Sequence, residues 1–451
     1  MKTRRRMAFS LVTAVTLLLI PLSAAQAVSL AVFNSSSPVA VEGQVAPNTG
    51  GQTFDRDGFD EPMTNAQGDV AFIATYGGAS GAGVFLSEGG RLSSVAISGQ
   101  STSAGTFAND GLSSFDGPQI NDSGTVAFAA RGWVGPGGLF QKTRWGSLTV
   151  LVQAGDAAPN GGSFMHFDDL AQNDHGDVAF IAQNDVGNWG VYLKPRWGPV
   201  QAIAVNGDTL PSTGNGTIDG SCYPDGPWIN NVGDVAFQID CISGGTGGFD
   251  GSYFLWSSGG GIQPLVMMGD PGPAGIGGTI TDIKAGRPAM NDQEIVLLLS
   301  LSGASTENVV TTKALNAGPG AGYQVCAQSG QPAPLGWGTN ETLSFNGDPT
   351  LAQDGSIGMA FTADPSNRDG IAKCVDGQVT LLALEGSAGQ GIVRIPSHQP
   401  EYRYGSLEES SRSTNHQVFL DETGSRTGVY QTMEFPFGYV GQPASRGVFG
   451  H

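Results

Sequence analysis

Three side chains suited to proton transfer or charge neutralisation lie in, or next to, segments that lead into a repeated turn motif: His166, Tyr223 and Arg287. A His or Tyr acting as base and acid, with an Arg that neutralises a uronate carboxylate, is the chemistry of β-elimination. The acidic neighbours Asp168 and Asp169 would repel a uronate unless they are paired. We therefore assign the three residues to catalysis only under a lyase hypothesis; the alternative is that they are ordinary loop residues.

Two further groups of residues are candidates for binding. His398, Tyr402 and Arg403 carry the same residue types in the corresponding segment near the C-terminal end, and we assign them to ligand binding. The metal candidates are Asp55, Asp57 and Asp60, because oxygen ligands at near-alternating spacing can hold Ca²⁺. The full EF-hand pattern is absent, so a solvated acidic turn is the alternative. No other cofactor is predicted.

Tryptophan follows arginine in two similar hairpin sequences, "TRWGSL" from Thr143 and "PRWGPV" from Pro195. These aromatic rings can stack on sugar rings, or they can pack on a neighbouring structural unit, and we favour the packing interpretation. Serine-hydrolase, phosphate-loop and dinucleotide-binding motifs lack the strand–turn–helix setting that they require.

The elements that must position these residues come from a repeated octet. It reads "NAQGDVAF" from Asn65, "NDSGTVAF" from Asn121, "NDHGDVAF" from Asn173 and "NNVGDVAF" from Asn230. Asn and Gly are typical of a tight turn, and the alternation that follows them predicts a strand. Related but altered turns start at Asn291, at Ala352 and, shortened, at Asn415.

Each unit contains four candidate strands. A P-x-x-N segment comes before the turn, the D-V-A-F strand follows it, and a G-V-F-like strand and an aliphatic strand ending in Gly complete the unit. Proline suits the innermost strand, whose free edge at the channel needs no ladder hydrogen bond. Seven such units predict an all-β fold, a seven-bladed β-propeller of four-stranded antiparallel blades. A β-solenoid is the less favoured alternative.

The chain ends predict how the ring closes. Residues 37–44, "SPVAVEGQ", match an outermost strand without a blade, and residues 427–433, "TGVYQTM", match a third strand without an outer neighbour. We therefore expect the N-terminal strand to complete the last blade, because an open ring would leave unpaired edges. The predicted domains are a signal peptide (1–27), the propeller (28–433) and a C-terminal tail (434–451).

The octets resemble the tandem N-x-x-G-x-x-A-F repeats of a family of secreted bacterial proteins. The resemblance covers essentially the whole mature chain and implies a β-propeller-like fold and an address outside the cytoplasm, without implying an activity. Many members end in surface-sorting signals, and no such signal is recognisable in this chain. Some polysaccharide lyases are also seven-bladed propellers, which the loop residues of this chain loosely resemble.

Composition and charge narrow the function further. The chain has 451 residues, 70 of them Gly, and a net charge of −19, which makes nucleic acid an improbable partner. The basic start, the apolar stretch and the Ala25-Gln26-Ala27 sequence are typical of a cleaved signal peptide. No later segment is long and apolar enough to span a bilayer.

The four cysteines predict disulfides in an exported protein, and three connectivities are open; Cys222–Cys241 and Cys326–Cys374 are the pairs nearest in sequence. We therefore predict a secreted, extracellular or periplasmic, binding module that recognises a carbohydrate or protein at one mouth of the channel. The alternative is a propeller-type polysaccharide lyase, or a glycan hydrolase.

Overall fold

The structure is a computed structural model. It describes residues 37–108, 115–130, 137–220, 222–244, 251–284, 290–333, 341–345, 349–366, 368–384, 417–420, 427–430, 432–435 and 445–450. Every regular element in these segments is a β-strand. In this part of the chain there is no helix of the length and apolarity needed to cross a membrane.

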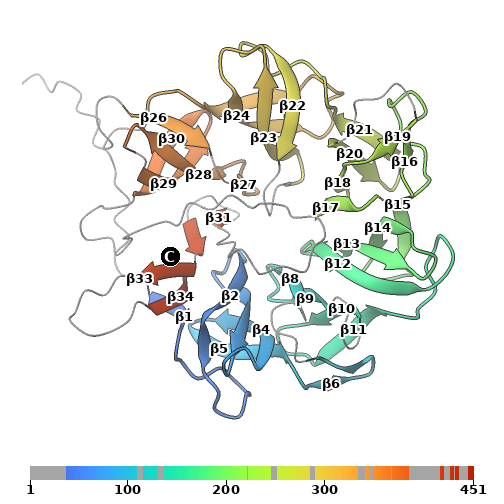
Figure 1. The fold of residues 1–451 in the computed structure, drawn as a ribbon, viewed down its shortest axis with the longest axis vertical. Coiled ribbons are helices and arrows are strands. Elements are labelled where there is room, and N and C mark those ends of the chain that lie inside the picture. The colour runs from blue at the N-terminus through green and yellow to red at the C-terminus, as the bar shows by residue number, and fades with distance from the viewer. Residues whose placement is uncertain are drawn as a thin grey trace, which may run out of the picture.

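The strands form antiparallel sheets arranged radially about a common centre, as in a propeller (Figure 1). We number the sheets 1 to 6 in the order in which their strands follow one another along the chain. Sheets 1 to 5 each have four strands in chain order from the central side outward, and in sheet 6 the first strand is split into two pieces. This confirms the all-β class, the four-stranded blades and the propeller-like arrangement.

The first strands of sheets 1 to 6 are β2 (Phe54–Thr64), β8 (Asp116–Ile120), β12 (Phe164–Gln172), β17 (Pro224–Ile229), β22 (Thr279–Lys284) and the pair β26 (Thr342–Phe345) and β27 (Thr350–Leu351). The second strands are β3 (Val70–Tyr76), β9 (Val126–Ala130), β13 (Val178–Asn184), β18 (Val235–Ile239), β23 (Glu294–Ser302) and β28 (Ile357–Asp364).

The third strands are β4 (Gly81–Glu88), β10 (Gly138–Lys142), β14 (Trp189–Lys194), β20 (Ser252–Ser257), β24 (Asn308–Ala314) and β29 (Arg368–Val375). The outermost strands are β5 (Arg91–Ile97), β11 (Leu148–Gln153), β15 (Gln201–Val205), β21 (Gly261–Val266), β25 (Tyr323–Gln328) and β30 (Gln378–Leu384). Two small pairs, β6 (Ser101–Thr102) with β7 (Gly105–Thr106) and β16 (Thr217–Ile218) with β19 (Ile242–Ser243), lie in the connections.

Each octet forms the predicted turn between a first and a second strand, and Gly124 and Gly176 adopt φ values of 73° and 85°. The asparagine has a second role that the sequence did not reveal. Asn173 Oδ1 accepts the amide of Asp177 within its own turn at 2.9 Å, while Asn173 Nδ2 donates to the carbonyl of Asn230 in the next sheet at 3.1 Å. The octet therefore caps a turn and also joins neighbouring sheets.

The same inter-sheet bond recurs around the ring. The asparagine donors are Asn65, Asn121, Asn173, Asn230 and Asn291, and each reaches the carbonyl at the corresponding position of the following sheet. A parallel series runs one residue later, where the backbone amides of Ala66, Asp122, Asp174 and Asn231 donate to the side chain at the corresponding position of the next sheet. We call the first series the asparagine relay. Sheet 6 has Ala352 at this position, so no side-chain amide continues the relay from there.

Proline lies in the first strand, as predicted, but for a different reason. Pro62, Pro118 and Pro227 fall within a shift of the pairing register between the first and second strands. Such a bulge leaves a residue outside the regular ladder, so a proline there removes no ladder hydrogen bond.

The core consists of side chains packed within and between the sheets. Sheets 1 to 3 each contain a cluster of four aromatic rings whose neighbouring centroids lie 4.9–6.2 Å apart. The members are Phe54, Phe59, Phe72 and Phe85 in sheet 1; Phe107, Phe115, Phe128 and Phe140 in sheet 2; and Phe164, Phe167, Phe180 and Tyr192 in sheet 3. Rings at the start of a first strand, or just before it, such as Phe54, Phe115 and Phe164, therefore belong to the core.

The chain ends pair differently from the prediction. The N-terminal strand β1 (Ser37–Val41) pairs with β34 (Ser445–Gly450), which also pairs with β33 (Thr432–Phe435). Residues 427–430 form β32 (Thr427–Tyr430), which pairs with β31 (Gln417–Leu420) instead of with β1. The predicted partner of the N-terminal strand is therefore corrected, and part of the predicted tail is strand.

The reason for this pairing lies in the sequence of β34, whose Gly447-Val448-Phe449 is another G-V-F strand. Its register against β1 (Gly447 with Val41, Val448 with Ala40) matches that of Gly83 with Ile97 and Val84 with Ala96 in sheet 1. The predicted signal peptide and the shortened turn at Asn415 lie outside the described residues.

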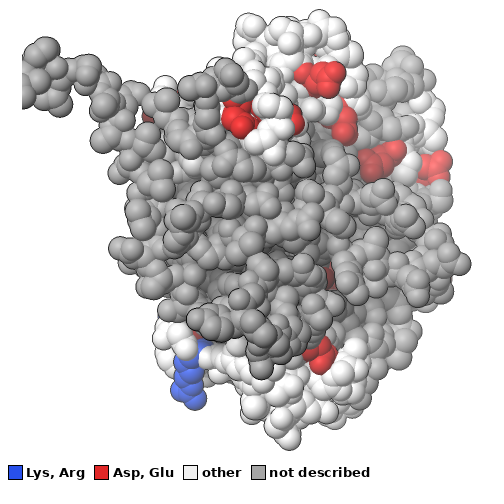
Figure 2. Space-filling model, turned by 60° about the vertical axis from the view of Figure 1, so that its left-hand side comes forward, with Lys and Arg blue, Asp and Glu red and all other residues white. Residues whose placement is uncertain are grey.

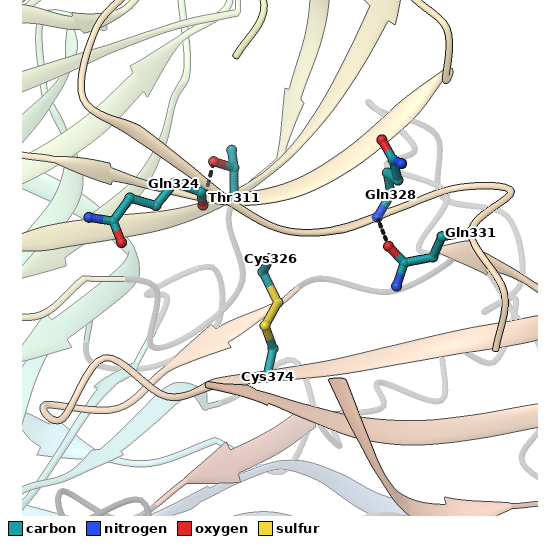
Figure 3. The surroundings of a disulfide bond; sticks show 6 residues. All are labelled: Thr311, Gln324, Cys326, Gln328, Gln331 and Cys374. Atoms are coloured by element: carbon teal, nitrogen blue, oxygen red, sulfur yellow. Dashed lines mark hydrogen bonds between the residues drawn. A yellow bond between two sulfur atoms is a disulfide. The ribbon is translucent and has the colours of Figure 1, made fainter. Parts of the chain in front are cut away.

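The four cysteines form the two disulfides nearest in sequence. Cys222–Cys241 joins the start of β17 to the end of β18 within sheet 4, with a Cα–Cα distance of 5.6 Å. Cys326 on β25 and Cys374 on β29 link sheet 5 to sheet 6 across 6.2 Å (Figure 3). The second disulfide is therefore a covalent contact between neighbouring sheets, which otherwise meet through packing and hydrogen bonds.

Candidate functional site

An aspartate occupies the same position in the first strands of sheets 1 to 4, five residues before the octet asparagine (65 − 60, 121 − 116, 173 − 168, 230 − 225). The residues are Asp60, Asp116, Asp168 and Asp225, and in each strand the register shift follows directly. These first strands lie on the central side of their sheets (Figure 1), and the four aspartates hold equivalent positions along them.

Three carboxylates of this region come close together. Carboxylate oxygens of Asp116, Asp168 and Asp169 all lie within 4.8 Å of one another, and Asp116 is buried. Tyr223, which comes just before β17 of sheet 4, hydrogen bonds to Asp168, and its ring packs edge-on against Trp189 of sheet 3 at 4.7 Å. We call Asp116, Asp168, Asp169 and Tyr223 the central cluster; three adjacent sheets contribute to it.

The electrostatics of the central cluster favour hydrogen bonding over proton abstraction. Burial raises the pKa of Tyr223 above its ordinary value, and Asp169, Asp168 and Asp116 raise it further. The phenol therefore stays protonated and donates a hydrogen bond to the carboxylate of Asp168. Three carboxylates at this spacing are accommodated by proton sharing or by a hard cation with oxygen ligands. Acidic atoms also occupy several separate places on the described surface in Figure 2.

The structure places only part of the predicted catalytic set. His166 lies on β12, two residues before Asp168, and pairs with Gln183 of β13. Tyr223 belongs to the central cluster, where its raised pKa makes it a donor rather than a base. Arg287 lies outside the described residues, as do the predicted binding residues His398, Tyr402 and Arg403.

The predicted calcium ligands do not form a described cluster. Asp55 uses both carboxylate oxygens to accept the amides of Gly78 and Ala79, each at 2.7 Å, and so stabilises a loop. Asp60 lies at the bulge of β2, and the side chain of Asp57 lies outside the described part of the chain. Calcium binding by Asp55, Asp57 and Asp60 stays a prediction.

The arginine–tryptophan hairpins correct another expectation. We favoured tryptophans packed on a neighbouring unit, but Trp145 and Trp197 are 89% and 82% exposed. In the first hairpin the arginine makes the contact with the neighbouring sheet instead, whereas Arg196 of the second hairpin contacts the octet turn of its own sheet. Arg144 of sheet 2 forms ion pairs with Asp69 and Glu88 of sheet 1.

The sequence contained a signal for part of the central cluster, which our sequence analysis did not use. An aspartate five residues before the octet asparagine recurs in four successive units, while Gly286 and Gly347 take that position in the next two. A charged residue that recurs at one position of the first strands indicates that its side chains occupy equivalent places in successive sheets.

Comparison with known proteins adds little about activity. No curated protein matches the sequence. Among solved structures, a gluconolactonase from Xanthomonas campestris has 12% identity and a TM-score of 0.33, covering 77% of this chain and 94% of that chain. An acylaminoacyl peptidase from Pyrococcus horikoshii has 9% identity and a TM-score of 0.43, covering 86% and 50%. The WD40 domain of SCAP from fission yeast has 10% identity and a TM-score of 0.37, covering 88% and 80%.

A family profile matches in two segments, residues 21–219 and 229–428, which together span most of the sequence. The two matches are separated by residues 220–228, which include most of β17, so each covers about half of the repeats. The chain therefore belongs to DUF7453, a family of unknown function.

Proposed function

We propose that the protein is an exported, non-enzymatic β-propeller that binds a carbohydrate or protein partner at one mouth of the ring. The proposal includes seven blades, the last completed by the N-terminal strand, and removal of residues 1–27 on export. The two disulfides support an extracellular or periplasmic location, because such bonds persist in oxidising compartments.

The central cluster carries the proposal. Its carboxylates are hydrogen-bond acceptors, its tyrosine hydroxyl is both donor and acceptor, and the neighbouring Trp189 ring adds apolar surface. Sugar hydroxyls are suitable donors to carboxylates, so an uncharged glycan fits this set of groups best. A polyanion would meet three carboxylates and a net charge of −19.

The lyase alternative has less support. A uronate substrate needs a base near the carbon that loses its proton and a cation near the carboxylate. Tyr223 holds its proton because its pKa is raised, and the nearest described charges around it are negative. Arg287 would have to supply the cation, and it lies outside the described residues.

A binding screen on neutral, acidic and amino-sugar glycans tests the proposal. We expect a neutral oligosaccharide to bind, and Tyr223→Phe to weaken binding by up to about tenfold, since one hydrogen bond between uncharged groups contributes about 0.5–1.5 kcal/mol. Tyr192→Phe is the matched control, because Tyr192 also donates a hydroxyl hydrogen bond, to Asn160 at 3.1 Å, but lies in the core of sheet 3. The control should bind normally.

Two results would contradict the proposal. Equal affinities of Tyr223→Phe and the unmodified protein would remove the central cluster from the site. Release of unsaturated uronates from an acidic polysaccharide, measured by the absorbance of these products, would establish the lyase alternative instead.

A further inference from the structure

Trp145 and Trp197 occupy equivalent hairpins of adjacent sheets. Trp145 lies between β10 and β11 of sheet 2, and Trp197 lies between β14 and β15 of sheet 3. Each hairpin lies beside the octet turn of its own sheet. The arginine before Trp145 lies next to Gly124, and the arginine before Trp197 donates its backbone amide to Asp177 at 2.7 Å. Both tryptophans therefore lie on the face of the ring that carries the octet turns.

Exposure of these two rings is unusual for their residue type. Tryptophan is highly buried on average, yet these indoles are 89% and 82% exposed. The other fully described hairpins between third and outermost strands are "EGGR" from Glu88, "SGGG" from Ser258, "LNAGPGAG" from Leu315 and "VDGQ" from Val375. None contains an aromatic residue, although Tyr323 begins the strand after the third of them. The two exposed indoles thus form a local pair on adjacent sheets and are not a general feature of the repeat.

Contacts of the two arginines hold the hairpins that carry the rings. Arg144 forms ion pairs with Asp69 and Glu88 of the preceding sheet, which fixes the first hairpin against sheet 1. In the second hairpin the guanidinium of Arg196 lies 5.2 Å from the centroid of the Trp197 ring. An arginine over one face of an indole orients the ring and leaves its other face for a ligand. Flat aromatic surfaces fixed before binding reduce the entropic cost of association.

The charge around the rings favours an uncharged ligand. The positive charge of Arg144 is matched by two carboxylates, and Arg196 has Asp177 as a neighbour. With a net charge of −19 on the whole chain, neither a polyanion nor an anionic membrane gains from approaching this face. Neutral pyranose rings present apolar C–H faces to aromatic rings and need no charge.

We propose that Trp145 and Trp197 form a surface site for a neutral polysaccharide, with one sugar stacked on each indole. We call it the tryptophan pair site. It lies on the octet face, whereas Tyr223 of the central cluster contacts Trp189 next to the loop between β13 and β14, at the opposite ends of the strands. A polymer that reaches both indoles gains from simultaneous binding at two places. This site goes beyond the proposed function and does not depend on it.

Affinity electrophoresis of the purified protein in gels containing single polysaccharides tests the tryptophan pair site. The probes are laminarin, hydroxyethylcellulose, glycogen and glycol chitin as neutral polymers, and polygalacturonate as the acidic one. We expect at least one neutral polymer to retard the protein and polygalacturonate not to. Trp145→Ala and Trp197→Ala should each weaken binding roughly tenfold, as expected for loss of a central aromatic contact, and the double variant should be retarded the least.

Two control variants separate the tryptophan pair site from apolar adsorption elsewhere on the surface and from the central cluster. Val186→Ala removes an apolar side chain that is 66% exposed in the loop between β13 and β14, and should leave retardation unchanged. Tyr223→Phe reports on the central cluster and keeps both indoles, so the further loss of retardation when Trp145→Ala and Trp197→Ala are added to it measures the tryptophan pair site alone. Because both tryptophans are exposed, their loss is not expected to unfold the protein, and equal melting temperatures of the variants would verify this.

Several outcomes would overturn the proposal. The first is that no neutral polymer retards the unmodified protein, and the second is that the double variant is retarded equally. If Tyr223→Phe alone abolishes retardation, binding belongs to the central cluster and the tryptophan pair site is refuted. Binding to phosphatidylcholine vesicles that the double variant loses, without any polysaccharide binding, would replace the glycan with a membrane surface.

Discussion

Removing one asparagine of the relay should loosen the contact between two sheets, and Asn173→Ala is the most informative change. Asn173 is buried, and its side chain makes three hydrogen bonds. The amide of Asp177 loses its acceptor, which costs about 1–3 kcal/mol for a buried group. The carbonyl of Asn230 retains the amide of Gly233 as a second donor at 3.1 Å, so its loss adds only about 1 kcal/mol. We expect the free energy of unfolding of Asn173→Ala to fall by about 2–4 kcal/mol.

Asn184→Ala is the matched control. Asn184 is also buried, accepts the amide of Asn188 at 2.9 Å and donates to the carbonyl of Gly161 at 3.0 Å, but all of these groups belong to sheet 3. Its loss should cost a similar amount without affecting the contact between sheets. Chemical denaturation measures the free energies of unfolding, and hydrogen exchange shows where each variant opens.

In Asn173→Ala, the backbone amides of the next octet turn, residues 230–234, should also exchange hydrogen faster. In the control, it should stay near residues 160–164 and 184–188. Exchange at 230–234 unchanged from the unmodified protein, or a loss of less than about 1 kcal/mol, would refute the idea that the relay couples neighbouring sheets.

Two further substitutions probe the turns and a buried charge. Gly176→Ala should destabilise the protein by about 1 kcal/mol, because φ is positive there and the added Cβ has only ordinary contacts. Gly124→Ala should destabilise it more, because its Cβ would approach Nε of Arg144 to 2.8 Å. Thermal melts that rank the two variants the other way would contradict this. Burial lowers the pKa of Lys313 to about 8, below its unfolded value of 10.5. The folded chain therefore releases this proton at lower pH than the unfolded chain, and between pH 7 and 9.5 the free energy of unfolding of the unmodified protein should rise relative to that of Lys313→Met. Parallel curves of stability against pH for the two proteins would contradict this titration.

The local features of the fold followed from the sequence because their causes are local. The turn is fixed by Asn and Gly, and the strands that follow are fixed by alternation, so strand order within sheets 1 to 6 was predictable. Features that depend on how sheets meet were not. The second role of Asn173 requires the carbonyl of a residue 57 positions later (230 − 173), which no local pattern specifies.

The exposure of the two tryptophans was hidden for a related reason. A hairpin sequence such as "TRWGSL" does not say which of two long side chains turns toward the neighbouring sheet. In the structure Arg144 satisfies Asp69 and Glu88, and Trp145 is left outside. The pairing of β1 was missed because G-V-F motifs occur in both candidate partners, and only the register against β34 separates them.

The asparagine relay also explains why the repeat is uniform while the candidate binding residues are not. The octet asparagine serves its own turn and the next sheet, so a substitution in one unit disturbs two. Positions that bear on one unit alone are under no such constraint. The position of Asp116 is Asp in four units and Gly in two others, and among the hairpins that the structure describes the position of Trp145 is aromatic in two adjacent sheets. Recognition is therefore to be sought where the units differ, and both the central cluster and the tryptophan pair site lie at such places, on sheets 2 to 4.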